Sequence, residues 1–111
     1  HLKAGRVKAL AVTSVQRYPL LPNVPPVGDT LRGFEVGSWY GLMAPAGTPP
    51  AIVAKLSEDV ARIIKQADVH ERLLNQGAQP VGSTPAQFAR HIEAELKKWA
   101  VVVKESGARV D

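Results

Sequence analysis

The sequence predicts an α/β fold of three helices with two or three strands, in which a long C-terminal helix is the largest element. Three stretches with apolar residues at every third or fourth position indicate the helices. Two apolar stretches with strand composition, Val7–Ser14 and Phe34–Ala44, indicate the strands. This mixed order of helices and strands is typical of α/β and α+β assemblies.

The first strand, Val7–Ser14, is short and largely apolar, as is typical of a strand buried on both faces of a sheet. In the next stretch, Gln16–Arg32, four prolines preclude regular strand pairing and favour an extended loop. A long loop without secondary structure is unusual inside a compact domain. We therefore interpret Gln16–Arg32 as a connection between two lobes.

The second strand, Phe34–Ala44, has two faces because side chains alternate along a strand. One face consists of Phe34, Val36, Ser38, Tyr40 and Leu42, and the other of Glu35, Gly37, Trp39, Gly41 and Met43. Two glycines on the same face indicate a kink, a bulge or a close backbone approach. A turn at Pro45–Gly47 is expected to end the strand.

The first helix is expected at about Pro49–Gln66, with Thr48 as the N-cap residue and Pro49 at the first helical position. Glu58 and Arg62 are expected to pair on its outer side. Its apolar stripe consists of Ile52, Val53, Leu56, Val60, Ile63 and Ile64. This helix is therefore expected to pack by one face.

A short helix and an extended piece are expected next. Asp68 can cap the short helix, which extends to Gln76 and stops at Gly77. The extended piece, Gln79–Gly82, could be a third strand. It leads directly into the last helix.

The last helix is expected at about Pro85–Ser106. Thr84 followed by Gln87 is the pattern of a capping box, and Gly107 is placed to end the helix. Its apolar positions Phe88, Ile92, Leu96, Trp99 and Val103 keep a spacing of three to four residues. Glu93 and Lys97 are expected to pair on the outer side.

Composition and charge exclude several classes of protein. The 111 residues suit one compact domain, and no apolar run approaches the roughly 20 residues that cross a bilayer. The formal charge is +4, but the basic residues are spread out and only 5% of residues are aromatic, so nucleic acid is not an expected partner. The absence of cysteine excludes disulfides and thiolate metal sites.

No catalytic residue, metal site or cofactor is predicted. His1, His70 and His91 lack the spacing of a metal-binding pair, apart from a weak pair of His91 with Glu95. The serines lack a nucleophile elbow, and the carboxylates lie on expected outer faces of helices. The loop before Pro49 could offer backbone amides to an anion, but prolines remove two donors there, so structural capping is the favoured reading.

Ser38, Trp39 and Tyr40 are the best candidates for contacting a ligand. Large aromatic residues with a polar group, placed next to glycines, suit the wall of a binding cleft. The same residues equally suit a strand packed under helices, and core packing is the favoured reading. The sequence alone therefore leaves both roles open.

Six motifs of the chain carry a resemblance to a known family. They are Leu10–Ser14, Leu21–Pro25, Gly33–Glu35, Trp39–Leu42, Ala44–Pro49 and Gly77–Gly82. In order and spacing they resemble the C-terminal part of a Bug-type, TctC-like receptor of a tripartite tricarboxylate transporter. The resemblance covers nearly the whole chain, although such receptors are considerably longer.

This resemblance implies a part of a periplasmic-binding-protein type II fold. Residues 1–33 would end the second lobe, and residues 34–111 would supply a hinge strand and the C-terminal helices of the first lobe. It also implies a periplasmic protein without enzymatic activity, which captures a small organic acid or amino acid and passes it to a membrane permease. We expect that the chain alone does not bind the solute.

The alternative function is a self-associating fragment without solute binding. Strand Val7–Ser14 would have lost its neighbours, and unpaired strand edges recruit other chains. A homodimer that is domain-swapped through Gln16–Arg32 would supply the missing partners.

Overall fold

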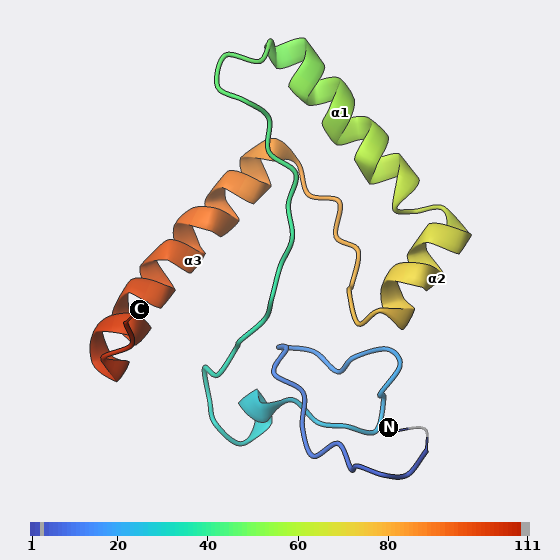
Figure 1. Cartoon of the computed structure of the whole chain (residues 1–111), viewed down its shortest axis with the longest axis vertical. Coiled ribbons are helices and arrows are strands. Elements are labelled where there is room, and N and C mark those ends of the chain that lie inside the picture. Colours follow the sequence, from blue (N-terminus) through green and yellow to red (C-terminus); the bar gives the residue numbers. More distant parts are fainter. Residues whose placement is uncertain (3, 110–111) are drawn as a thin grey trace. The chain divides into compact units, whose positions relative to one another are not determined.

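The computed structural model describes residues 1–2 and 4–109, and every element of regular secondary structure within them is a helix. A short 3-10 helix, η1 (Val27–Asp29), is followed by three α-helices, α1 (Pro50–Ile63), α2 (Ala67–Asn75) and α3 (Pro85–Ser106) (Figure 1). The chain divides into two compact units. The first unit comprises His1–Tyr40 and Arg72–Ala78, and the second comprises Gly41–Glu71 and Gln79–Asp111.

The first unit is organised around one isolated parallel β-bridge between Val12 and Pro26. The Val12 N–H donates to the carbonyl of Pro25 at 2.9 Å, and the Val27 N–H donates to the carbonyl of Val12 at 2.8 Å. Proline fits at the centre of this bridge because the bridge uses the polar groups on either side of residue 26 and needs no N–H there. Pro26 is buried as a result.

Helix α2 is tied to the first unit at its C-terminal end. The Tyr18 hydroxyl donates to the carbonyl of Leu74, which has no partner within the helix. Gly77 ends α2 with a φ of 83°, and the N–H groups of Gly77 and Ala78 donate to the carbonyls of Leu74 and Leu73. This pair of bonds forms a Schellman motif. The predicted stop at Gly77 is therefore confirmed, but Asp68 lies in the first turn of α2 rather than before it.

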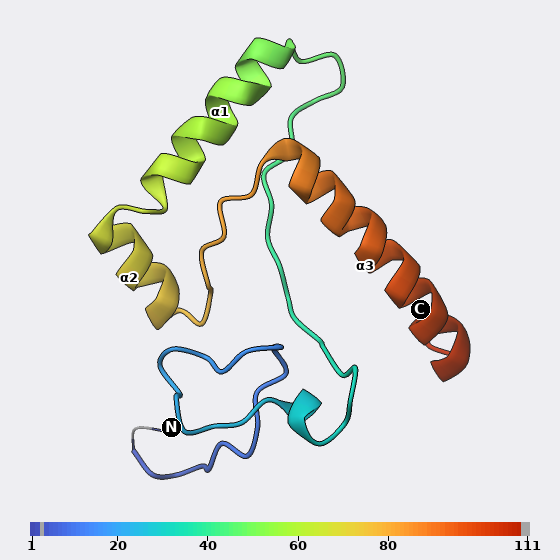
Figure 2. The same ribbon diagram turned by 180° about the vertical axis from the view of Figure 1, so that it is seen from behind.

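The second unit contains α1 and α3, which contact each other. Both views show α3 as one unbroken helix (Figures 1 and 2). Thr84 accepts a hydrogen bond from the N–H of Gln87, and the Gln87 side chain accepts one from the N–H of Thr84 at 2.9 Å. Gly107 ends α3 in the left-handed conformation with a φ of 68°. The predicted bounds and both predicted caps of α3 are confirmed.

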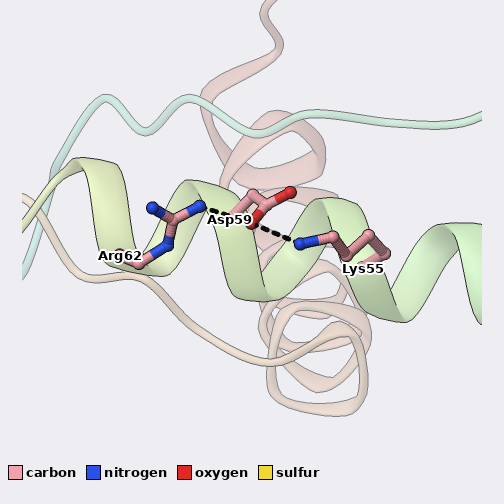
Figure 3. A network of polar contacts seen from close by, with 3 residues as sticks. All are labelled: Lys55, Asp59 and Arg62. Atoms are coloured by element: carbon pink, nitrogen blue, oxygen red, sulfur yellow. Dashed lines mark hydrogen bonds and ion pairs between the residues drawn. The ribbon is translucent and has the colours of Figure 1, made fainter.

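Helix α1 is confirmed, but its start and its ion pair differ from the prediction. The N-cap residue is Pro49 rather than Thr48, because the Thr48 hydroxyl donates to the carbonyl of Pro45 at 2.8 Å. Arg62 pairs with Asp59, and Asp59 also accepts from Lys55 one turn earlier (Figure 3). Asp59 lies between both cations on the helix surface.

The described residues include no strand, so the predicted strands Val7–Ser14 and Phe34–Ala44 are not formed. Residues 79–83 likewise form no strand. A strand requires a neighbour that pairs with its backbone, and one isolated pair is marginal in water. Val7–Ser14 finds only the bridge to Pro26 and one further backbone hydrogen bond, which the Val36 N–H donates to the carbonyl of Thr13. This corrects the strand part of the α/β prediction, while the helical part is confirmed.

No large hydrophobic side chain is buried among the described residues. Apolar side chains of α1, of α3 and of residues 34–44 remain exposed to solvent. A domain of this size normally hides more than half of the surface of its unfolded chain in a shared core. The described residues therefore lack the usual source of stability, which is a close-packed interior.

Candidate functional site

Residues 34–45 run without helix, strand, turn or bend and contain the three residues predicted to contact a ligand (Figure 1). At the start of this run, the Val36 N–H donates to the carbonyl of Thr13 at 3.0 Å, within the first unit. At its end, the Thr48 N–H donates to the carbonyl of Pro45 and closes a turn. Gly47 has a φ of 83° in this turn, as the third residue of a type II turn requires.

Gly41 approaches the Phe88 side chain of helix α3 so closely that a Cβ atom at this position would have to displace the ring. A Cβ atom built on Gly41 would lie 2.0 Å from Cζ of Phe88, which is far inside contact distance. The predicted close approach is therefore found at Gly41. At Gly37, by contrast, a Cβ atom would meet nothing within 4 Å.

Ser38, Trp39 and Tyr40 do not form one cluster. In extended chain, alternate side chains point to opposite sides, so Ser38 and Tyr40 share one face and Trp39 belongs to the other. Tyr40 is 90% exposed, Trp39 is 40% exposed, and Ser38 is also exposed. The proposed role of these three residues in binding a solute stays a prediction.

Two shallow hollows lie elsewhere. One, of about 390 Å³, lies in the first unit and is lined by Leu2, Val7, Lys8, Ala9, Leu21 and Val24. The other, of about 530 Å³, lies in the second unit between the first half of α1 and the start of α3. It is lined by Thr48, Pro50, Val53, Ala54, Ser57, Glu58, Thr84 and Pro85. Neither hollow includes a predicted ligand-contacting residue.

The start of α1 is poorly suited to bind an anion. Pro49 and Pro50 have no N–H to donate, and the Thr48 hydroxyl is used by the carbonyl of Pro45. The carboxylate of Glu58 lines the same hollow and would repel a negative charge. These contacts favour a structural role for this loop over a role in binding an anion.

Helix α3 carries a cluster of polar and aromatic residues that the sequence analysis did not single out. The indole N–H of Trp99 donates to Oε2 of Glu95 at 2.8 Å. Lys98 pairs with Glu95, and its ammonium group lies 5.5 Å from the centre of the Trp99 ring. Spacings of three and four residues could have predicted these contacts. They connect neighbours on one helix and make no cavity.

The predicted weak metal pair, His91 with Glu95, finds no further ligand. No group of three or more histidine, cysteine, aspartate or glutamate side chains is placed to hold a metal ion within residues 1–2 and 4–109. The His91 ring stacks instead with Phe88, with ring centres 6.5 Å apart and planes 20° apart. His91 therefore extends the aromatic surface beside Gly41.

None of the helices in the described part of the chain is long and apolar enough to cross a membrane.

A family model described as "Tripartite tricarboxylate transporter family receptor" matches residues 1–108. The match covers nearly all of the sequence. The chain therefore belongs to the family of tripartite tricarboxylate transporter receptors.

Curated relatives agree with this assignment. A UPF0065 protein from the tcbD-tcbE intergenic region of Pseudomonas sp. strain P51 is 37% identical over 95% of this chain and 32% of its own length. BugT of Bordetella pertussis is 35% identical over 99% of this chain and 34% of its own length. A UPF0065 protein from the TAR-I ttuE-ttuC' intergenic region of Agrobacterium vitis is 39% identical over 96% of this chain and 32% of its own. The chain spans about a third of the length of these relatives.

Proposed function

We propose that the chain is the C-terminal part of a periplasmic receptor that captures a small carboxylate-bearing solute for a tripartite tricarboxylate-type transporter. The match of residues 1–108 to the receptor family carries this proposal. The solute would be an organic acid or an amino acid, and the receptor would deliver it to a membrane permease. Because the family consists of transport receptors, the proposal includes no catalytic step and no cofactor.

The exposed apolar surfaces support the same proposal. Leu42 is 78% exposed and Met43 is 73% exposed, although neither residue suits contact with water. Large exposed apolar surfaces mark places where another polypeptide binds. In the proposed receptor, residues 1–33 end the second lobe, and residues 34–111 belong to the hinge strand and the first lobe.

In this proposal, Ser38, Trp39 and Tyr40 face the solute cleft from the hinge strand. A chimera tests this role: the matched third of BugT is replaced by this chain, and calorimetry with citrate, succinate and glutamate measures solute binding. We expect the chimera to bind at least one of these carboxylates and the 111-residue chain to bind none. Micromolar affinity of the chain alone would contradict the proposal.

The alternative, a homodimer swapped through Gln16–Arg32, stays a prediction. In the structure this loop folds back on its own unit, because Pro26 bridges Val12 of the same chain. A swapped dimer would have to open this bridge. Sedimentation equilibrium of the 111-residue chain tests the alternative directly, and a dimer that persists at low concentration would favour it.

A further inference from the structure

Helix α1 has two faces of different character. Helical spacing places an apolar stripe on one face, which consists of the exposed residues Ile52, Leu56 and Ile63. Another face forms one wall of the hollow of about 530 Å³, along Pro50, Ala54 and Glu58. The other wall is the start of α3, and both walls belong to the second unit.

The carboxylate of Glu58 is left without a partner on this helix. Lys55 and Arg62 lie three and four residues away, at the spacing that allows an ion pair. Both cations pair instead with Asp59, at 2.9 Å and 2.7 Å (Figure 3). Within the described part of the chain, the Glu58 carboxylate makes no hydrogen bond and no ion pair. It is therefore available to a cation from another molecule.

The hollow combines this single charge with apolar and hydroxyl-bearing side chains. Its uncharged lining consists of two prolines, one valine, one alanine, two threonines and one serine. Lysine and arginine suit such a surface, because their aliphatic stems pack along apolar groups while their charged ends reach a polar partner. A basic side chain could lie along Val53 and Pro85 and bring its charge to Glu58. An anion would be repelled by the same carboxylate.

The two faces of α1 suit two different partners. A surface that folding covers permanently is apolar, as the stripe is, because an unpaired charge in the interior costs much free energy. The hollow instead mixes apolar, hydroxyl and charged groups, as interfaces that form and come apart do. A receptor that delivers a solute must bind and release its permease in every cycle. The hollow therefore fits contact with the permease better than a place in the receptor interior.

We propose that the hollow between α1 and α3 is a docking site for a lysine- or arginine-bearing periplasmic loop of the membrane permease. Glu58 is the residue that pairs with the basic side chain, and complementary charges of this kind select partners and speed their encounter. Asp59 keeps Lys55 and Arg62 paired, so that neither neutralises Glu58. This inference rests on the proposed function and adds the surface that contacts the permease.

Binding of the BugT chimera to a permease tests the docking site. The probe is a tripartite tricarboxylate-type permease that binds BugT, reconstituted in lipid nanodiscs. Glu58→Gln is expected to raise the Kd of the chimera about tenfold, because the basic side chain loses its counter-charge. Glu105→Gln is the matched control, since it removes the same charge from the last turn of α3, outside the hollow. Its Kd should be nearly that of the unchanged chimera.

A variant outside the hollow tests the part played by Asp59. Asp59→Asn releases Lys55 and Arg62, which can then pair with Glu58. Docking should weaken, although Asp59 does not line the hollow. The double variant Glu58→Gln/Asp59→Asn should dock no more weakly than Glu58→Gln alone, because the released cations no longer have a carboxylate to neutralise. Two losses that multiply would show independent effects and contradict the proposal.

Urea denaturation of the same chimeras tests the competing occupant of the hollow, which is the receptor's own polypeptide. We expect Glu58→Gln to leave the free energy of unfolding unchanged, because the hollow is open in the free receptor. A large loss of stability without weaker docking would identify the receptor itself as the occupant and overturn the proposal. Equal docking of the chimera and its Glu58→Gln variant, or no docking of either, would also overturn it.

Solute binding by the same chimeras separates this inference from the proposed function. Glu58→Gln should leave the affinity for the carboxylate unchanged, because the hollow includes none of Ser38, Trp39 and Tyr40. A chimera that binds a carboxylate but docks independently of Glu58 would overturn the inference and leave solute capture standing. Docking that depends on Glu58, without binding of any tested carboxylate, would overturn solute capture and leave the docking site standing.

Discussion

Helix α3 and the extended residues 37–44 differ in how their backbone polar groups can be satisfied. In α3, hydrogen bonds run within the helix, and the capping box at Thr84 and the left-handed Gly107 cover its two ends. Gly37, Ser38 and residues 40–44 make no such local bonds, because an extended chain can be paired only by a neighbour. A helix can therefore form on its own, whereas a strand forms only when another segment is present to pair with its backbone.

Substituting Gly41 should most strongly disturb the connection between these two regions. In the BugT chimera, Gly41→Ala is expected to lower the free energy of unfolding by about 1–3 kcal/mol, because the new Cβ atom must displace the Phe88 ring. Gly37→Ala is the matched control and should cost clearly less, since nothing lies within 4 Å of its Cβ position. Urea denaturation measures both values. Equal losses would show that the Gly41–Phe88 contact contributes nothing.

Removing the N-cap of α3 tests the region whose backbone polar groups are satisfied by nearby residues, which is the helix itself. Thr84→Ala is expected to destabilise the start of α3 by about 1 kcal/mol, because the N–H of Gln87 loses its acceptor. Thr48→Ala serves as the control, since the Thr48 hydroxyl donates to Pro45 and caps no helix. Amide exchange in the first turns of α3 and α1 measures the two effects. A larger effect from Thr48 would contradict the assignment of the caps.

The link between Tyr18 and helix α2 can be tested with two matched variants. Tyr18→Phe removes a hydrogen bond to the carbonyl of Leu74 and should cost about 0.5–1.5 kcal/mol. Tyr40→Phe removes the same hydroxyl from a side chain that is 90% exposed and should be nearly neutral in the 111-residue chain. Exchange of the Gly77 and Ala78 amides reports the end of α2. Faster exchange in the Tyr40 variant alone would contradict the structure.

The smallest expected effect is a pH dependence of α1. Hydrogen bonds from Arg62 and then from Lys55 lower the pKa of Asp59 below its ordinary value. The folded chain therefore gains stability from ionised Asp59 above the pKa of the unfolded chain and loses it as the pH falls through the lowered pKa. Helix content followed by circular dichroism from pH 7 to about pH 2 should fall slightly less in Asp59→Asn. An identical pH profile in both proteins would exclude this contribution.

The helices are largely predictable because the residues that start and end them are close in sequence. The Thr84–Gln87 box and Gly107 set the bounds of α3, and Gly77 sets the end of α2. The prediction that Thr48 caps α1 was wrong because the hydroxyl of this threonine donates a hydrogen bond within the preceding turn instead. Such competition between two local hydrogen bonds depends on backbone geometry that the residue types alone do not specify.

The strands and the candidate site are less predictable because they depend on segments that are distant in the sequence or that belong to other polypeptide. Composition predicts a strand at residues 34–44 that the structure does not form, because composition says nothing about the neighbour that a strand needs. The glycine pattern indicated a close approach, yet only the structure identifies Phe88 as the side chain that fills the space at Gly41. The assignment of Ser38, Trp39 and Tyr40 to a solute site likewise depends on what faces them and stays a prediction.

Differential scanning calorimetry of the 111-residue chain tests most directly whether its apolar surfaces require further polypeptide. A self-contained domain of this length should unfold in one sharp transition, with a heat-capacity increase of about 1.5 kcal/mol/K. Because no large hydrophobic side chain is buried among the described residues, we predict a broad transition and a much smaller heat-capacity increase. A sharp transition with the full heat-capacity increase from a monomer would contradict the proposal that this chain is part of a larger receptor fold.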